Sequence, residues 1–114
     1  MNPLKFYKCL SDDTRLRCLL LIEKEHELCV CELTAALKEI QPKISRHLAQ
    51  LRKCGLLIDR RQSQWVFYQV NPQLPEWCKL VLTQTLSANP EFIKKNLQQL
   101  CKMDDRPVRP DSCC

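Results

Sequence analysis

The sequence contains very little glycine: Gly55 is the only one among its 114 residues. A loop that cradles phosphate groups and a sandwich of short strands both rely on glycine, so this composition disfavours them and favours a mostly helical fold. No apolar run reaches the roughly 18 residues needed to cross a membrane, and the first residues lack the apolar core and cleavage site of a signal peptide. We therefore expect one cytoplasmic domain, which fits a chain of this length.

Cysteine, by contrast, is abundant, with nine residues. The odd number and the lack of an export signal disfavour a framework of structural disulfides. In a reducing cytosol such residues fill the core, bind metals or sense oxidants, and Cys9, Cys18 and Cys78 lie in apolar helical patterns that indicate the core or an interface. The net charge of +5 favours a polyanionic partner.

The most informative stretch runs from Gln41 to Gly55. Its apolar residues recur at spacings of four and three, whereas its basic and amide side chains fall on the opposite helical face. The apolar stripe consists of Ile44, Leu48 and Leu51, and the opposite face holds Lys43, Arg46, Gln50 and Lys53. Gly55 stands where a helix ends in a positive φ. A helix of this kind suits insertion into a DNA groove, although an ordinary solvated helix has the same pattern.

Three further helices are expected before this stretch. Residues 3–10 have helical apolar spacing, Ser11 or Asp12 can cap a second helix, and a third, short helix begins near Cys31. Pro42 then suits the first turn of the Gln41–Gly55 helix, where its missing N–H costs nothing. Two short helices joined by a tight linker form a helix-turn-helix.

After Gly55 the apolar period changes to that of strands. The segments L-L-I-D-R-R and W-V-F-Y-Q-V are rich in branched and aromatic residues, and a polar tip, R-R-Q-S-Q, joins them into a β-hairpin. Because the tip has no glycine, we expect a loop longer than a two-residue turn. A hairpin after a recognition helix is a wing, so Arg60 and Arg61 are candidates for contact with phosphates or the minor groove. A solvated hairpin tip is the alternative.

Two more helices are expected after the hairpin. The helix from Glu76 to Leu86 is apolar on more than one side, so it closes the core or forms a dimer interface. Asn89 and Pro90 suit the cap and the first position of a last helix. The predicted fold is mainly α with a β-hairpin wing, a winged helix-turn-helix in the order α-α-α-α-β-β-α-α. This domain spans residues 1–102, and residues 103–114 are expected to form a disordered tail that ends in cysteines.

This order of elements, with the motifs E-L-C-V-C-E-L and Q-P-K-I-S-R-H-L-A-Q-L-R-K-C-G-L-L, resembles the ArsR/SmtB family of bacterial metal-responsive repressors, and most of all its arsenic repressors. The resemblance covers residues 4 to 100 or so. It implies a transcriptional repressor and not an enzyme: a winged-helix homodimer that binds double-stranded operator DNA near its own promoter and leaves it when a metalloid binds. No constitutive cofactor is implied, and As(III) or Sb(III) would be the inducer.

The resemblance also assigns DNA contacts by position. Ser45, Arg46 and His47 of the S-R-H-L motif would face DNA, with Gln41, Lys43 and Gln50 as further candidates. The fork of Arg46 can donate two bonds to guanine or phosphate. His47 lies nearer the packed side, where a partly buried histidine bonded to the backbone is the alternative. The two recognition helices of a dimer would lie roughly 34–36 Å apart and would need an imperfectly palindromic operator.

The same resemblance makes Cys29 and Cys31 the metalloid ligands; without it, a C-x-C segment at a helix start is more simply part of the core. On a regular helix, side chains two positions apart point about 200° away from each other. We therefore expect the two sulfurs to converge on a soft ion only if the helix start unwinds. That distortion would pass through Leu33 and Leu37 to the recognition helix, so that the metalloid favours a conformation that fits DNA badly.

Thr34 occupies the position at which some arsenic repressors carry a third cysteine. Water or an exogenous thiol could complete a two-thiolate site, or another cysteine could do so, with Cys54, Cys113 and Cys114 as candidates. A two-thiolate site would also suit a methylated trivalent arsenical.

Three alternatives stay open at this point. A repressor of the same fold could respond to cadmium, lead or zinc, although Glu76 to Leu86 lacks the histidine of the family's other zinc site. A redox repressor could use Cys29 or the Cys113/Cys114 pair. A thiol enzyme is disfavoured, because the chain has no C-x-x-C motif and no identifiable base beside a cysteine.

Overall fold

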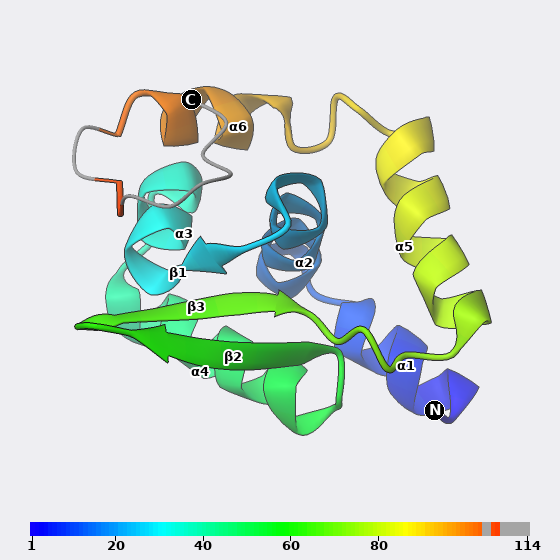
Figure 1. The fold of residues 1–114 in the computed structure, drawn as a ribbon. Coiled ribbons are helices and arrows are strands. Elements are labelled where there is room, and N and C mark those ends of the chain that lie inside the picture. The colour runs from blue at the N-terminus through cyan, green and yellow to red at the C-terminus, as the bar shows by residue number, and fades with distance from the viewer. Residues whose placement is uncertain (104–105, 108–114) are drawn as a thin grey trace.

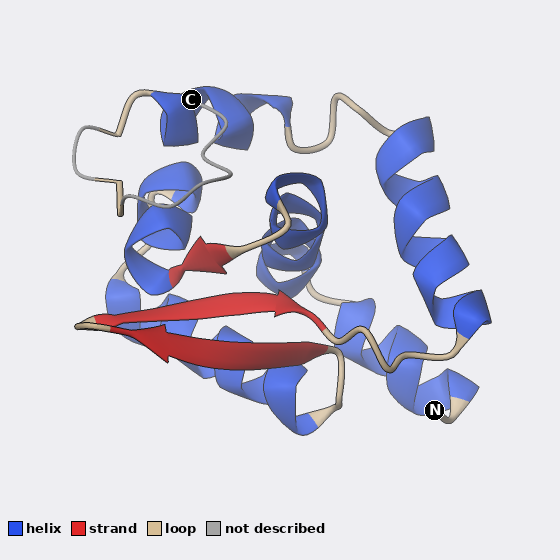
Figure 2. Cartoon of the chain, in the orientation of Figure 1, coloured by secondary structure: helices blue, strands red, loops and turns tan. Residues whose placement is uncertain are grey.

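A computed structural model describes residues 1–103 and 106–107 as helices packed around a small antiparallel sheet (Figures 1 and 2). The elements are α1 (Pro3–Leu10), α2 (Asp13–Glu25), β1 (Leu28–Cys29), α3 (Val30–Leu37), α4 (Gln41–Lys53), β2 (Leu57–Gln62), β3 (Trp65–Val70), α5 (Glu76–Ala88) and α6 (Lys94–Cys101). The predicted winged helix-turn-helix is therefore confirmed, with one strand, β1, added between the second and third helices.

Helix α4 forms as its apolar spacing predicts. Ile44, Leu48 and Leu51 are fully buried against the core. The helix ends at Lys53, and two positions later Gly55 has a φ of 87°, in the left-handed region. There the N–H of Leu56 donates to the carbonyl of Leu51 at 3.0 Å and closes the last turn. Glycine is needed here for its backbone freedom, since an added Cβ would contact only the Met1 side chain at 3.8 Å.

Strand β1 was not predicted. Its two residues pair antiparallel with β3, Leu28 opposite Tyr68 and Cys29 opposite Phe67. The sheet order is β1-β3-β2 (Figure 2), so the chain is tied to the wing immediately before it enters α3. A pair of residues is too short to show strand periodicity, and only the pairing with β3 defines it.

The hairpin confirms the predicted wing, but the prediction of a long tip was wrong. Gln62 pairs with Trp65, which leaves a two-residue turn of Ser63 and Gln64. Ser63 adopts a φ of 55°. Serine therefore takes the left-handed conformation that glycine usually supplies in such tight turns.

The start of the last helix also differs from the prediction. Helix α6 begins at Lys94 and not at Pro90, and the N–H of Phe92 instead donates to the carbonyl of Asn89 in a turn. The Arg17 side chain explains the delay, because its Nη1 donates to the Phe92 carbonyl and to Asn96 Oδ1. Its guanidinium also lies 4.1 Å from the centroid of the Phe92 ring. The turn is thus fixed by α2.

Helices α1 and α5 lie together on one side of the molecule (Figure 1), joined by aromatic contacts. The ring of buried Phe6 meets that of Trp77 edge-on at 5.0 Å, and the Tyr7 ring lies 6.3 Å from the same indole. Leu4 of α1 and Leu80 of α5 are 81% and 52% exposed. The two helices therefore present an apolar surface to solvent. Within residues 1–103 and 106–107, no helix is long and apolar enough to span a bilayer.

Candidate functional site

Two thiols meet where β1 passes into α3. Cys29 ends β1 and caps α3 with extended angles, φ −95° and ψ 170°, whereas Cys31 lies in the first turn of that helix. Their Sγ atoms are 2.7 Å apart. The expectation that these sulfurs diverge until the helix unwinds was wrong, because Cys29 lies outside the helix and its side chain can turn toward Cys31.

A soft ion bound by both thiols would connect two elements of the fold. Cys29 is paired with Phe67 in the sheet, and Cys31 belongs to α3. The ion would therefore tie the wing, through β3, to the start of α3.

A cavity of about 390 Å³ opens beside the thiols. It is lined by Cys29, Val30, Cys31, Thr34, Gln41, Gln64, Trp65 and Val66. These residues come from the end of β1, from α3, from the first position of α4 and from the tip of the wing. The cavity is therefore the place where the thiols meet both elements of the predicted DNA-binding surface.

The protonation of the buried thiol is set by its surroundings. Cys29 is 1% exposed, while Cys31 is half-buried. Burial, the hydrogen bond with Cys31 and the charge of Glu32 together raise the pKa of Cys29 well above the ordinary value of a thiol. Cys29 is accordingly a neutral thiol near pH 7.

A buried ion cluster supports the start of α3. Glu32 accepts the backbone N–H of Cys29 on one carboxylate oxygen at 2.9 Å and the Nε–H of Arg106 on the other at 2.7 Å. Arg106 also pairs with Glu25 at 3.3 Å, and all three side chains are less than 10% exposed. Sequence reasoning missed Glu32, although an acidic residue three positions after a cap is a known capping signal, and nothing local to Arg106 indicates its partners.

The segment from Met103 onward, predicted to be a disordered tail, includes Arg106, whose ion pairs reach Glu25 of α2 and Glu32 of α3. Residues 104–105 and 108–114 lie outside the described residues, and with them the candidate ligands Cys113 and Cys114.

Cys54 is not brought to the thiol pair. It caps the far end of α4, and its sulfur is bonded to that of Cys9, a disulfide that the sequence did not lead us to expect. Among the residues placed by the structure, no group of three or more His, Cys, Asp or Glu side chains could hold a metal ion. Thr34 borders the cavity, but its hydroxyl donates to the Cys31 carbonyl at 2.8 Å.

The outer face of α4 carries most of the predicted DNA contacts. Gln41, Arg46 and Gln50 are exposed, and Lys43 and Ser45 are partly so. Two of these side chains already have partners. Lys43 pairs with Glu39 at 2.9 Å, and Gln50 accepts a hydrogen bond from Arg15 at 2.9 Å. The face is polar and basic, as a groove-binding helix requires.

His47 lies on the opposite, packed side of α4. It is 8% exposed, and its Nε2 lies 3.9 Å from an oxygen of Asp12 at the start of α2. His47 is thus buried, as in our alternative for this residue, but without the expected bond to neighbouring backbone, since its Nδ1 has no hydrogen-bond partner among the described residues. The helical spacing places it between Ile44 and Leu51 on the inward stripe.

The two arginines of the wing differ in their surroundings. Arg60 makes a two-pronged ion pair with Glu27, at 2.6 and 2.7 Å, and its guanidinium lies 4.8 Å from the centroid of the Phe67 ring. Arg61 points to the other face of the strand and is exposed. Of the two, Arg61 is the one whose charge is available to a phosphate.

Comparison with known proteins agrees with this architecture. A family model described as bacterial regulatory protein, arsR family, matches residues 12–59. The chain is 54% identical to the arsenic resistance transcriptional regulator ArsR2 of Pseudomonas putida, over 100% of this chain and 99% of that protein. It is 41% identical to the arsenical resistance operon repressor of Escherichia coli, over 90% and 87% of the two chains. The solved structure of HlyU from Vibrio cholerae matches with a TM-score of 0.69 at 28% identity, over 77% of this chain and 91% of that one.

Proposed function

Because the chain belongs to the arsR family of bacterial regulatory proteins, whose named relatives here are transcriptional regulators and not enzymes, we propose that it is a metalloid-responsive repressor. It binds operator DNA as a homodimer in the cytoplasm, and arsenite or antimonite releases it by binding Cys29 and Cys31. One observation carries this proposal: the paired thiols share a cavity with the first residue of α4 and the tip of the wing.

The chemistry of the pair suits a trivalent metalloid. Arsenous acid, As(OH)₃, exchanges two hydroxide groups for the two sulfurs; each departing hydroxide takes a thiol proton and leaves as water. Thiolate is a soft ligand and therefore a favoured partner for such an ion. The third position on arsenic or antimony then faces the cavity, where water or an exogenous thiol completes the coordination in place of a third cysteine at Thr34.

Release follows from the way the thiols are anchored. The ion ties Cys29, which pairs with β3, to Cys31 in α3, and α3 packs against α4. The loaded protein thus favours a position of wing and recognition helix that fits DNA less well. The metalloid and the operator compete through this conformational difference, and each lowers the affinity of the other.

The dimer is supported by the exposed apolar surface of α1 and α5. Leu4 and Tyr7 on α1, with Trp77 and Leu80 on α5, are all at least 36% exposed. A contiguous apolar surface of this kind on a small protein marks an interaction site. A second copy of the chain would cover it and place two α4 helices on one operator.

The proposal is tested with a labelled DNA fragment taken from upstream of the protein's own gene. Fluorescence anisotropy measures binding during titration with arsenite, antimonite, cadmium and zinc. We expect arsenite and antimonite to release the wild-type protein. The double variant C29S/C31S should bind the fragment and stay bound when arsenite is added.

The matched control is C18A, which removes a fully buried thiol of α2 outside the cavity. It should respond to arsenite like the wild type. Arsenite-driven release of C29S/C31S would refute the assignment of the ligands. Release of the wild type by cadmium or zinc alone would instead identify a divalent-metal repressor.

A further inference from the structure

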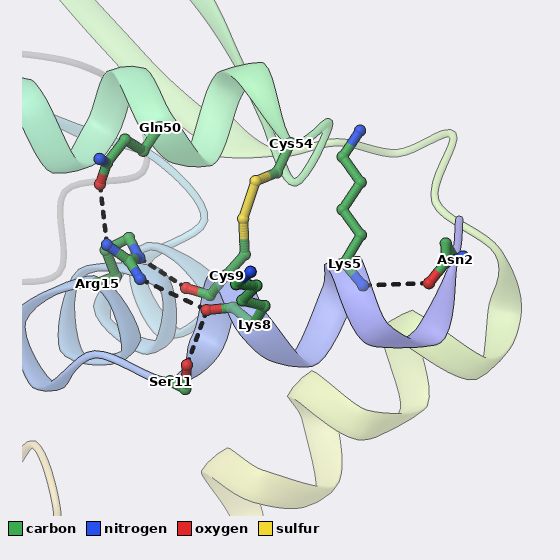
Figure 3. Close-up of a disulfide and its surroundings, with 8 residues drawn as sticks. All are labelled: Asn2, Lys5, Lys8, Cys9, Ser11, Arg15, Gln50 and Cys54. Carbon is green, nitrogen blue, oxygen red and sulfur yellow. Dashed lines mark hydrogen bonds between the residues drawn. A yellow bond between two sulfur atoms is a disulfide. The ribbon is translucent and has the colours of Figure 1, made fainter.

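A second pair of cysteines joins two helices with different tasks. Cys9 lies in the last turn of α1 and Cys54 caps the C-terminal end of α4, 45 positions later, and their sulfurs form a disulfide (Figure 3). Helix α1 contributes to the exposed apolar surface, and α4 carries the basic face. The bond therefore links the candidate dimer surface directly to the candidate recognition helix.

The surroundings of this pair favour thiol chemistry. A cavity of about 260 Å³ opens beside both sulfurs and is lined by four cationic side chains, Lys5, Lys8, Arg15 and Lys53. Nearby cations stabilise a thiolate, which is the reactive form of cysteine. Cys54 is half-buried, so a small oxidant in the cavity can reach it, whereas Cys9 is only 8% exposed.

Arg15 fixes the geometry around the bond (Figure 3). Its Nε donates to the Cys9 carbonyl at 2.8 Å, and its Nη1 donates to Gln50 Oε1 at 2.9 Å. One guanidinium thus holds the end of α1 and a side chain of the outer face of α4 at the same time. A change at the Cys9–Cys54 bond therefore affects the position of Gln50, a residue expected to contact DNA.

The presence of a disulfide calls for an explanation in a DNA-binding regulator. Proteins that work in a reducing compartment rarely keep structural disulfides, and those they form are usually transient and redox-sensing. We propose that Cys9 and Cys54 are a thiol–disulfide switch that hydroperoxides close, separate from the Cys29/Cys31 metalloid pair, and that its closure weakens operator binding.

The reaction balances with a hydroperoxide as the oxidant. The Cys54 thiolate attacks the O–O bond and becomes a sulfenic acid, and the peroxide leaves as water or an alcohol. The Cys9 thiol then attacks the sulfenic sulfur, the S–S bond forms, and a second water carries away the hydroxide and the thiol proton. Two electrons pass from the two thiols to the peroxide, and a dithiol reductant reverses the change by exchange.

The expected effect follows from the added constraint. When the disulfide is formed, the end of α4 cannot shift relative to α1. Helix α4 then cannot change its angle to the dimer surface as it enters a DNA groove. An ordinary allosteric coupling corresponds to roughly 5- to 150-fold in affinity, and we expect about tenfold weaker operator binding for the oxidised protein.

The experiment treats the full chain with hydrogen peroxide, maps disulfides by mass spectrometry of unreduced peptides, and measures operator affinity by anisotropy before and after adding dithiothreitol. We expect a Cys9–Cys54 linked peptide that appears together with the loss of affinity and disappears with its recovery. The C9S/C54S variant should bind the operator like the reduced wild type, ignore peroxide, and still be released by arsenite.

Several results would overturn this proposal. They are the absence of the Cys9–Cys54 peptide after oxidation, an oxidised protein that binds as well as or better than the reduced one, and a peroxide response that persists in C9S/C54S. The single variant C54A, at the half-buried position, gives the same test if the double variant fails to fold. A reduced wild type that does not bind the fragment would count against the proposed function, whereas the peptide map reports on the switch independently of DNA.

Discussion

Arg106 is the residue on which the buried charges around α3 depend. It supplies the cation for Glu25 and Glu32, and Glu32 in turn holds the backbone N–H of Cys29. A buried ion pair contributes little compared with an apolar replacement of both partners, but removing one partner leaves a charge without compensation. A substitution of Arg106 therefore tests whether this residue belongs to the folded domain.

The substitution R106M should destabilise the protein by about 3 kcal/mol, because two carboxylates would remain buried without their cation. Urea unfolding, followed by circular dichroism, measures this as a lower midpoint at an unchanged slope. The control is R52M, at an arginine whose side chain is 55% exposed in its pair with Asp59; a change within about 0.5 kcal/mol is expected there. Equal effects of the two substitutions would contradict the buried cluster.

At the scale of elements, the wing separates two arginines that the sequence could not distinguish. Arg60 is held by Glu27 and lies over Phe67, whereas Arg61 is exposed on the other face of β2. Alternation along a strand places the two side chains on opposite faces. The partner of Arg60 is Glu27, 33 positions earlier, so the local sequence did not indicate it. Both arginines are exposed, and only the folded chain shows that Arg60 is paired with an acidic side chain.

We expect R61A to weaken operator binding at every sequence tested and to lower the slope of log affinity against log salt by about one. R60A should leave that slope nearly unchanged, since its charge is already neutralised by Glu27. Anisotropy titrations over a series of salt concentrations measure both. A larger loss of slope for R60A than for R61A would mean that the wing approaches DNA by its other face.

The elements that the sequence predicted correctly are those decided by local spacing. The stripe of Ile44, Leu48 and Leu51 and the glycine at position 55 suffice to define α4, and both behave as expected. The predictions that failed depend on distant partners. Strand β1 exists because it pairs with β3, and the start of α6 is delayed because Arg17 holds the Phe92 carbonyl, 75 positions away.

For the candidate site, too, some features were predicted correctly and others were not. The resemblance to the family, and not the residue pattern alone, singled out Cys29 and Cys31, and the rule for a regular helix gave the wrong geometry because Cys29 precedes the helix. The cavity beside them contains Trp65 and Gln64 from the wing. No spacing rule brings these residues to α3, since they arrive there through the sheet.

On the scale of the whole molecule, the exposed apolar surface requires an explanation. Leu4 with Tyr7 and Trp77 with Leu80 are each three positions apart on their helices, so each pair lies on one helical face. The contact between the rings of Tyr7 and Trp77 joins the two faces into one surface. Apolar burial of this kind drives protein association, and self-association by a two-fold axis uses the same surface on both copies.

The last prediction concerns this surface. The double variant L4D/L80D should sediment as a monomer, with the chain mass of 13.4 kDa, whereas the wild type should sediment at twice that mass. Its operator affinity should fall as well, because one α4 reaches only one half-site. I40D is the control, since Ile40 is 69% exposed but precedes α4, away from α1 and α5. A dimer that survives L4D/L80D, or one that I40D dissociates equally well, would place the interface elsewhere. The Cys9–Cys54 bond would then have no link to the spacing of the two recognition helices.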